Sequence, residues 1–202
     1  ETSDLLVHGL ASAKDSALRF IMLSALRCLV EQNPKIKLNR LLLKDEIAGE
    51  VRIYTSLHKL YRFYHQNPWK ESGDYLAIAM KALMDESIER VFKYLRLLYP
   101  RDVLPLIYDA LRSHHHDSPL KTHAIELLNN TIEPDLILMI QPVLEGVKYL
   151  PVKEEEARVI LKRFLASEDR WFVLAARLLV EELDLEIQIT QESIFPEKMI
   201  GL

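Results

Sequence analysis

Apolar residues recur at steps of three and four along most of the chain, which is the spacing of amphipathic helices. Prolines and polar clusters separate these stretches, because proline is tolerated in the first turn of a helix and disrupts its interior. The pattern predicts helices at residues 4–11, 16–31, 38–65, 75–98, 102–113, 119–131, 134–148, 153–166 and 170–184. Only residues 185–190 alternate with period two, and one such segment cannot make a sheet. We therefore expect an all-α fold.

Two long helices carry the clearest apolar stripes. The stripe of the helix at 38–65 consists of Ile47, Val51, Tyr54, Leu57, Tyr61 and Tyr64. The stripe of the helix at 75–98 consists of Leu76, Met80, Leu83, Val91, Leu95 and Leu98. Two i,i+4 pairs, Glu86 with Arg90 and Glu89 with Lys93, are expected on the solvent face of the second helix.

Capping chemistry agrees with these helix starts. Asp74, Ser118 and Asp169 each precede a predicted helix and are of the residue types that favour the N-cap position. Glu154, Glu155 and Glu156 occupy a predicted first turn, where the positive end of the helix dipole favours carboxylates. We expect these glutamates to form a solvated first turn, with an acidic recognition patch as the alternative.

A short turn pattern of Leu, Ser and Asp returns three times, at 10–15, 111–117 and 165–169. In each copy the leucine closes one helix into the core, the serine makes a polar exit and the aspartate caps the next helix. Small residues that permit close helix approach follow each turn: Ala25, Ala124, Ala175 and Ala176. Hairpins of this kind cannot bury their apolar faces alone. The repeat predicts a HEAT/armadillo-like α-solenoid of stacked antiparallel helix pairs, with one domain at 1–185 and a tail or linker at 186–202.

Composition and charge favour a globular module. Hydrophobic residues make up 49% of the chain, charged residues 28%, and the net charge is −4. A nucleic-acid module normally carries a basic excess or stripe, so nucleic-acid binding is disfavoured. The density of Arg and Lys across residues 19–62 keeps it open as an alternative.

Cys28 is the single cysteine, which excludes a disulfide within the chain and a Cys-rich zinc site. It lies in the apolar run 20–30, so we expect a buried core thiol. The chain begins at Glu1, which indicates a piece of a longer protein or a processed product. No signal peptide and no membrane-spanning apolar stretch is visible, so we expect a soluble domain.

His114, His115 and His116 with Asp117 and His123 form the most conspicuous polar cluster. Such residues can bind zinc, but consecutive histidines in a turn point apart, so we predict a solvated loop and no metal site. Adventitious metal binding is the alternative.

Aromatic and imidazole side chains supply the candidate partner contacts. His58, Tyr61 and His65 share the helix at 38–65, where they form either an amphipathic surface or a binding face. Trp69 is expected to anchor a loop, and Trp171 with Phe172 to pack between repeats, but either tryptophan would be a good contact residue if exposed.

The sequence contains none of the glycine-rich phosphate loops, metalloprotease helices or serine-nucleophile turns that mark common enzymes. No carboxylate is placed by a recognisable motif to make a catalytic base of His58 or His65. We predict no catalytic residues, no cofactor and no small-molecule substrate.

Five segments point to a more particular family, and they cover about half of the chain. They are Leu41–Glu46, Val91–Pro100, Ala110–Ser113, Ala124–Asn130 and Ile140–Glu145. This series resembles the HEAT-like region of bacterial membrane proteins related to ATP/ADP translocases and major-facilitator carriers. That family often has a cyclic-nucleotide-binding domain after the HEAT-like region, and more often shows Asp where Asn129 or Asn130 stands.

The resemblance implies a cytoplasmic, non-catalytic coupling module at the inner face of a membrane, whose partners are neighbouring domains of the same chain. The alternatives are a free-standing adaptor that binds another protein, and a HEAT-like protein that grips nucleic acid.

Overall fold

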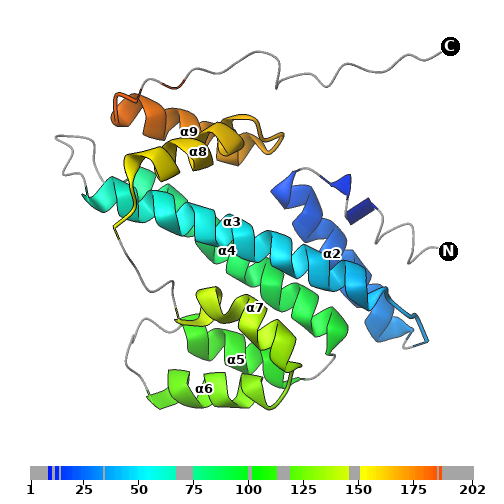
Figure 1. The fold of residues 1–202 in the computed structure, drawn as a ribbon. Coiled ribbons are helices and arrows are strands. Elements are labelled where there is room, and N and C mark those ends of the chain that lie inside the picture. Colours follow the sequence, from blue (N-terminus) through cyan, green and yellow to red (C-terminus); the bar gives the residue numbers. More distant parts are fainter. Residues whose placement is uncertain are drawn as a thin grey trace, which may run out of the picture. The chain divides into compact units, whose positions relative to one another are not determined.

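The computed structural model describes residues 9–10, 12–13, 15–33, 35–66, 75–99, 102–112, 119–145, 151–185 and 187. These residues form eight α-helices and contain no β-strand (Figure 1). The helices are α2 (Ser16–Gln32), α3 (Arg40–Gln66), α4 (Tyr75–Leu98), α5 (Val103–Arg112), α6 (Pro119–Asn129), α7 (Pro134–Glu145), α8 (Glu154–Leu165) and α9 (Arg170–Glu182). The predicted all-α class is confirmed. Most of the predicted helix at 4–11 and of the alternating stretch at 185–190 lies outside the described residues.

The chain divides into two compact units. The first comprises residues 1–58 and 82–149, and the second comprises residues 59–81 and 150–202. The long helices α3 and α4 each contribute to both units. The single domain predicted at 1–185 stays a prediction.

In the first unit, α2, α3 and α4 share an apolar core with α5, α6 and α7. Helix α5 packs on α6 and α6 on α7, so these three short helices form a local group (Figure 1). The stripes predicted for α3 and α4 are largely correct for this unit, because the following members are buried: Ile47, Val51, Tyr54, Leu57, Leu83, Val91, Leu95 and Leu98.

The second unit contains a hairpin of α8 and α9. Phe164 and Phe172 stack between the two helices, with ring centroids 5.2 Å apart. Ala175 and Ala176 are buried, as predicted for positions of close helix approach. Lys59 Nζ donates a hydrogen bond to Glu156 Oε1 at 2.6 Å and thereby ties α3 to the start of α8.

The helix termini confirm part of the capping pattern. Asp15 accepts hydrogen bonds from the backbone N–H groups of Ala17 and Leu18, and Asp169 accepts one from Trp171. Asp74 and Ser118 lie outside the described residues. Helix α9 ends before Asp184, whose φ of 44° reverses the chain in the left-handed region that Asp tolerates better than most residues.

Four details of the repeat and stripe predictions are wrong. Ala25 is exposed, and Leu165 is only half-buried. Arg90 is buried rather than on a solvent face. Lys93 is half-buried because its aliphatic stem carries the ammonium to 4.0 Å from the centre of the Phe20 ring.

Candidate interaction surfaces

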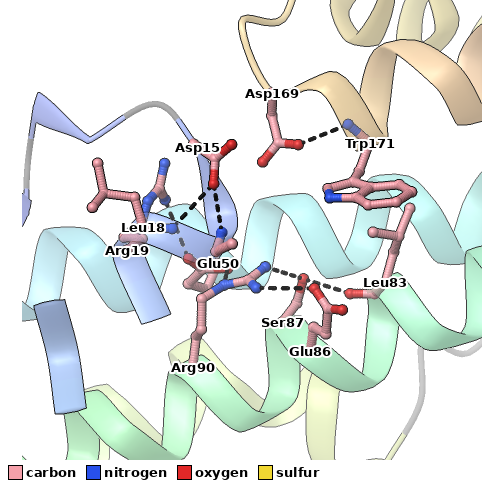
Figure 2. A network of polar contacts seen from close by, with 11 residues as sticks. Asp15, Leu18, Arg19, Glu50, Leu83, Glu86, Ser87, Arg90, Asp169 and Trp171 are labelled. Atoms are coloured by element: carbon pink, nitrogen blue, oxygen red, sulfur yellow. Dashed lines mark hydrogen bonds and ion pairs between the residues drawn. The ribbon is translucent and has the colours of Figure 1, made fainter. Parts of the chain in front are cut away.

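A buried carboxylate on α3 organises the polar interior of the first unit. Glu50 Oε2 lies 3.0 Å from Arg90 Nε, and Glu50 Oε1 accepts a hydrogen bond of 3.2 Å from Arg19 Nη1. Glu50 is 0% exposed and Arg90 is 2% exposed. Figure 2 shows the two guanidinium groups converging on Glu50 from α2 and α4. This ion triad joins α2, α3 and α4 beside their shared apolar core.

Two further hydrogen bonds lie beside the triad. Arg90 Nη2 donates to Ser87 Oγ at 3.3 Å, and the Ser87 hydroxyl donates to the Leu83 carbonyl (Figure 2). Burial raises the pKa of Glu50, and the guanidinium groups of Arg90 and Arg19 oppose that rise. Because Glu50 and Arg90 are buried and pair with each other inside the unit, we interpret the arrangement as structural.

A second cluster fastens the start of α7 to the start of α3. Glu133 accepts hydrogen bonds of 2.6 Å from both Arg40 Nη2 and Lys44 Nζ, and Lys44 also donates to Asp135 at 2.9 Å. These contacts raise the pKa of Lys44 to about 12, chiefly through Asp135 and then Glu133, and lower the pKa of both carboxylates. Tyr99 accepts a hydrogen bond from the Glu133 backbone N–H.

The predicted aromatic and imidazole face of α3 is only partly assembled. The ring centroids of Tyr61 and His65 are 4.4 Å apart with edge-to-face geometry, and His65 also meets Tyr64 at 5.5 Å. His58 lies against Tyr54, with centroids 6.0 Å apart, and is half-buried. Tyr61 and His58 therefore serve the packing of α3 itself, and His65 alone among the predicted histidine contacts is well exposed.

The two tryptophans have different outcomes. Trp69 and the histidines at 114–116 lie outside the described residues. Trp171 is 56% exposed, so the packing predicted for it is wrong, whereas its neighbour Phe172 is buried as predicted. The same exposed side of α9 carries Leu174 and Leu178, at spacings of three and four. We call Trp171, Leu174 and Leu178 the α9 face.

A second exposed apolar stripe lies on α2. Leu18, Ile21, Ala25 and Cys28 follow one another at steps of three, four and three, and all four are exposed. We call these four residues the α2 face. The buried thiol predicted for Cys28 is wrong, because α2 is apolar on nearly every side and the core takes Leu23 and Leu26 instead.

The first unit also has a shallow pocket of about 480 Å³ between the end of α2 and the start of α3. Its walls are mainly apolar, and Arg40 at its edge already binds Glu133 and the Leu98 carbonyl. No group of three or more His, Cys, Asp or Glu side chains among the described residues is arranged to hold a metal ion. His123 makes a contact of 3.5 Å with Glu126 on the surface of α6.

Sequence reasoning missed the ion triad and the α2 face, although both leave a signal. Glu50 interrupts the apolar stripe of Ile47, Val51 and Tyr54, which marks a charge directed into a core. The 3–4–3 spacing of the α2 face is readable, but the apolar residues around the rest of α2 conceal it.

Comparisons with known proteins add no identification. No helix within the described part of the chain is long and apolar enough to cross a membrane. No family model matches the sequence, and neither a curated protein nor a solved structure is significantly similar to it.

Proposed function

We propose that this chain is a non-catalytic interaction and coupling module that binds a protein surface through the α9 face. The observation that carries the proposal is the exposure of Trp171, Leu174 and Leu178 on one side of a helix whose opposite side is fully packed. Tryptophan is the residue type most enriched among the energetically dominant contacts of interfaces. A flanking leucine one turn away on the same helix supplies the further apolar contact that such an anchor requires.

The packing of neighbouring helices supports a HEAT-like, solenoid-type scaffold as the frame of this module. Helices adjacent in sequence pack on each other in α5 with α6, α6 with α7, and α8 with α9. Hairpins packed in this local manner present long helix faces without a deep cavity. In this proposal the frame binds a partner through the shape of its helix faces and performs no reaction on it.

The partner that we propose is another part of the same, longer polypeptide. This rests on the resemblance of residues 38–145 to the region that joins a transporter-like membrane part to a ligand-sensing part, and it would place the module on the cytoplasmic side. A separate adaptor partner is the second outcome that the experiment below distinguishes.

Nucleic acid is a poorer candidate because five of the nine basic residues in 19–62 already pair with carboxylates. Arg19, Arg27, Arg40, Lys44 and Lys59 each form an ion pair with a carboxylate. Phosphate binding would have to break these pairs, whereas affinity for nucleic acid depends on basic groups that can replace counterions.

Site-specific photo-cross-linking in the cells that make the full-length protein tests the proposal. A benzoylphenylalanine at position 174 should give one discrete adduct, and the same group at the exposed position 162 of α8 should not. The double variant Trp171→Ala, Leu178→Ala should abolish the adduct. Mapping of the cross-linked peptide to the same polypeptide supports the coupling role, and mapping to a different protein supports the adaptor. Absence of an adduct at 174, or its persistence in the double variant, would refute binding through the α9 face.

A further inference from the structure

The exposed face of α2 has the spacing of a coiled-coil contact. The α2 face has steps of three, four and three, so Leu18, Ile21, Ala25 and Cys28 occupy the first and fourth positions of two successive seven-residue repeats. Leu18 is 49% exposed and Ile21 is 63% exposed, while Leu23 and Leu26 on the other side of the helix are buried. Helix α2 thus presents one apolar side to its own core and a second apolar side to solvent.

The order of side-chain sizes along the α2 face determines what fits against it. The two large residues, Leu18 and Ile21, come first, and the two small ones, Ala25 and Cys28, come last. A second α2 lying antiparallel, with its two-fold axis at residue 23, sets Leu18 against Cys28 of the second copy and Ile21 against Ala25 of the second copy. Every layer of that contact then combines one large and one small side chain.

A parallel pair would be much poorer. It would set Leu18 against Leu18 and Cys28 against Cys28, so the helices would be forced apart at one end and leave voids at the other. Protein interiors and interface cores are close-packed, and layers that alternate large with small residues achieve that density. The antiparallel arrangement also sets the two helix dipoles in opposite directions, which is favourable.

Charge does not oppose this contact. The charged residues of α2 are Arg19, Arg27 and Glu31. Arg19 is engaged by Glu50, and Arg27 Nε donates to Glu31 Oε1 at 2.7 Å within the same helix. Ala17, Met22, Ser24 and Leu29 border the α2 face and are uncharged, and Glu31, which also borders it, is already paired with Arg27. Two α2 faces can therefore meet without burying an unpaired charge.

We propose that two copies of this chain associate through antiparallel packing of their α2 helices. The four layers extend over about 15 Å, because ten residues separate Leu18 from Cys28 at about 1.5 Å per residue. This contact is smaller than a standard interface of about 800 Å² per partner. The dimer is therefore weak and reversible, and it uses a surface separate from the α9 face.

Sedimentation of the full chain over a micromolar-to-millimolar concentration series tests the association. The wild type should pass from monomer to dimer as its concentration rises, and Ile21→Glu should remain monomeric. Leu106→Glu introduces the same charge at an exposed leucine of α5 and should dimerise like the wild type. A wild type that stays monomeric throughout, or equal effects of the two substitutions, would overturn the proposal. Circular dichroism should show unchanged helicity in both variants because both sites are exposed.

Oxidative cross-linking tests the orientation. In the antiparallel pair, Leu18→Cys puts a new thiol directly opposite Cys28 of the second copy, within the Cα separation of 4.4–6.8 Å that a disulfide requires. Within one copy the same two positions are about 15 Å apart along the helix, so an 18–28 disulfide must join two copies. Peptide mapping should find this linkage as the main product. Linkages of 28 to 28 or of 18 to 18 as the main products would indicate parallel pairing and refute the proposed orientation.

The two proposals can fail separately. Trp171→Ala with Leu178→Ala should leave the sedimentation series unchanged, and Ile21→Glu should leave the cross-link at position 174 unchanged. A dimer lost in the α9 variant would show that α2 is not its contact.

Discussion

Arg90 Nε lies 3.0 Å from Glu50 Oε2 in the interior of the first unit, and neither side chain is accessible to water. The contact joins the middle of α3 to the middle of α4, beside the buried apolar residues Ile47, Val51 and Val91. Removing two charges from water costs several kcal/mol each, and their attraction repays that cost only when both remain present. We therefore expect the pair to contribute more to the relative alignment of α3 and α4 than to the free energy of unfolding.

Removing one member of the pair should be far more harmful than removing both. We expect Glu50→Gln to lower the free energy of unfolding by about 3–5 kcal/mol, because it removes the buried counter-charge of Arg90 and leaves only the exposed Glu86 beside it. The double variant Glu50→Leu, Arg90→Met should be less destabilised than the sum of its single variants. Urea unfolding followed by circular dichroism measures each value.

Glu86→Gln is the matched control for this pair. Glu86 also contacts Arg90, at 3.5 Å, but from an exposed position. Its loss should cost no more than about 1 kcal/mol, as for other surface ion pairs. Equal losses for Glu50→Gln and Glu86→Gln would contradict the buried-pair interpretation.

The cluster of Lys44, Glu133 and Asp135 should make stability depend on pH in acid. The pKa of each carboxylate is lowered in the folded chain, from ordinary values of 4.5 for Glu133 and 3.8 for Asp135. Their contribution is therefore complete above those ordinary values and is lost as the pH falls through the lowered ones. Lys44→Met removes the group that lowers both pKa values most, so the stability of this variant should fall less steeply in acid than that of the wild type.

The urea midpoint of both proteins, measured from neutral pH down to pH 3, checks this dependence. The difference between wild type and Lys44→Met should shrink toward zero at the acid end. Lys81→Met, at an exposed lysine of α4, should follow the wild-type curve. At the alkaline end, the Lys44 contribution should persist below its ordinary pKa of 10.5 and disappear toward about 12. A pH-independent difference would exclude these ion pairs as its source.

The N-cap of α2 should contribute a measurable share of stability. Asp15 accepts hydrogen bonds of 2.9 and 3.0 Å from two backbone N–H groups that have no partner within the helix. We expect Asp15→Ala to cost about 1 kcal/mol in unfolding free energy and Asp15→Asn to cost much less, because Asn can accept the same bonds. Thermal unfolding compares them, and equal losses in the two variants would argue against a capping role.

The spacing of apolar residues predicts most of the helices and the buried face of α3. Ile47, Val51 and Leu57 could be assigned to the core because α3 has a polar side that contrasts with them, so spacing alone identifies the buried face. The same reasoning failed for Cys28, since α2 has apolar residues on two sides and local spacing does not say which side meets the core. That choice depends on how α2 packs against α3 and α4, which the spacing within α2 does not reveal.

Charged residues show the same limit. The i,i+4 relation of Arg90 to Glu86 predicts a solvent-exposed side chain for Arg90, because that relation is a local feature of the helix. Its actual environment is set by Glu50, forty residues earlier, and no local pattern reveals that partner. The sequence names Trp171 as a candidate contact residue. Its exposure, however, depends on how α9 packs on α8 and cannot be derived from its local sequence.

Trp171 and Phe172 are adjacent residues with opposite environments, so they separate stability from binding. Phe172→Ala removes a buried ring stacked on Phe164 and should lower the unfolding free energy by about 3–5 kcal/mol. Trp171→Ala removes a ring that is mostly in solvent and should change it by about 0.5 kcal/mol or less. The same Trp171→Ala chain should lose the photo-adduct of position 174 almost completely, since interface anchors dominate binding energy. A strong loss of stability in Trp171→Ala would mean that the indole packs within the fold. The α9 face would then lack the exposed tryptophan on which the proposed partner contact depends.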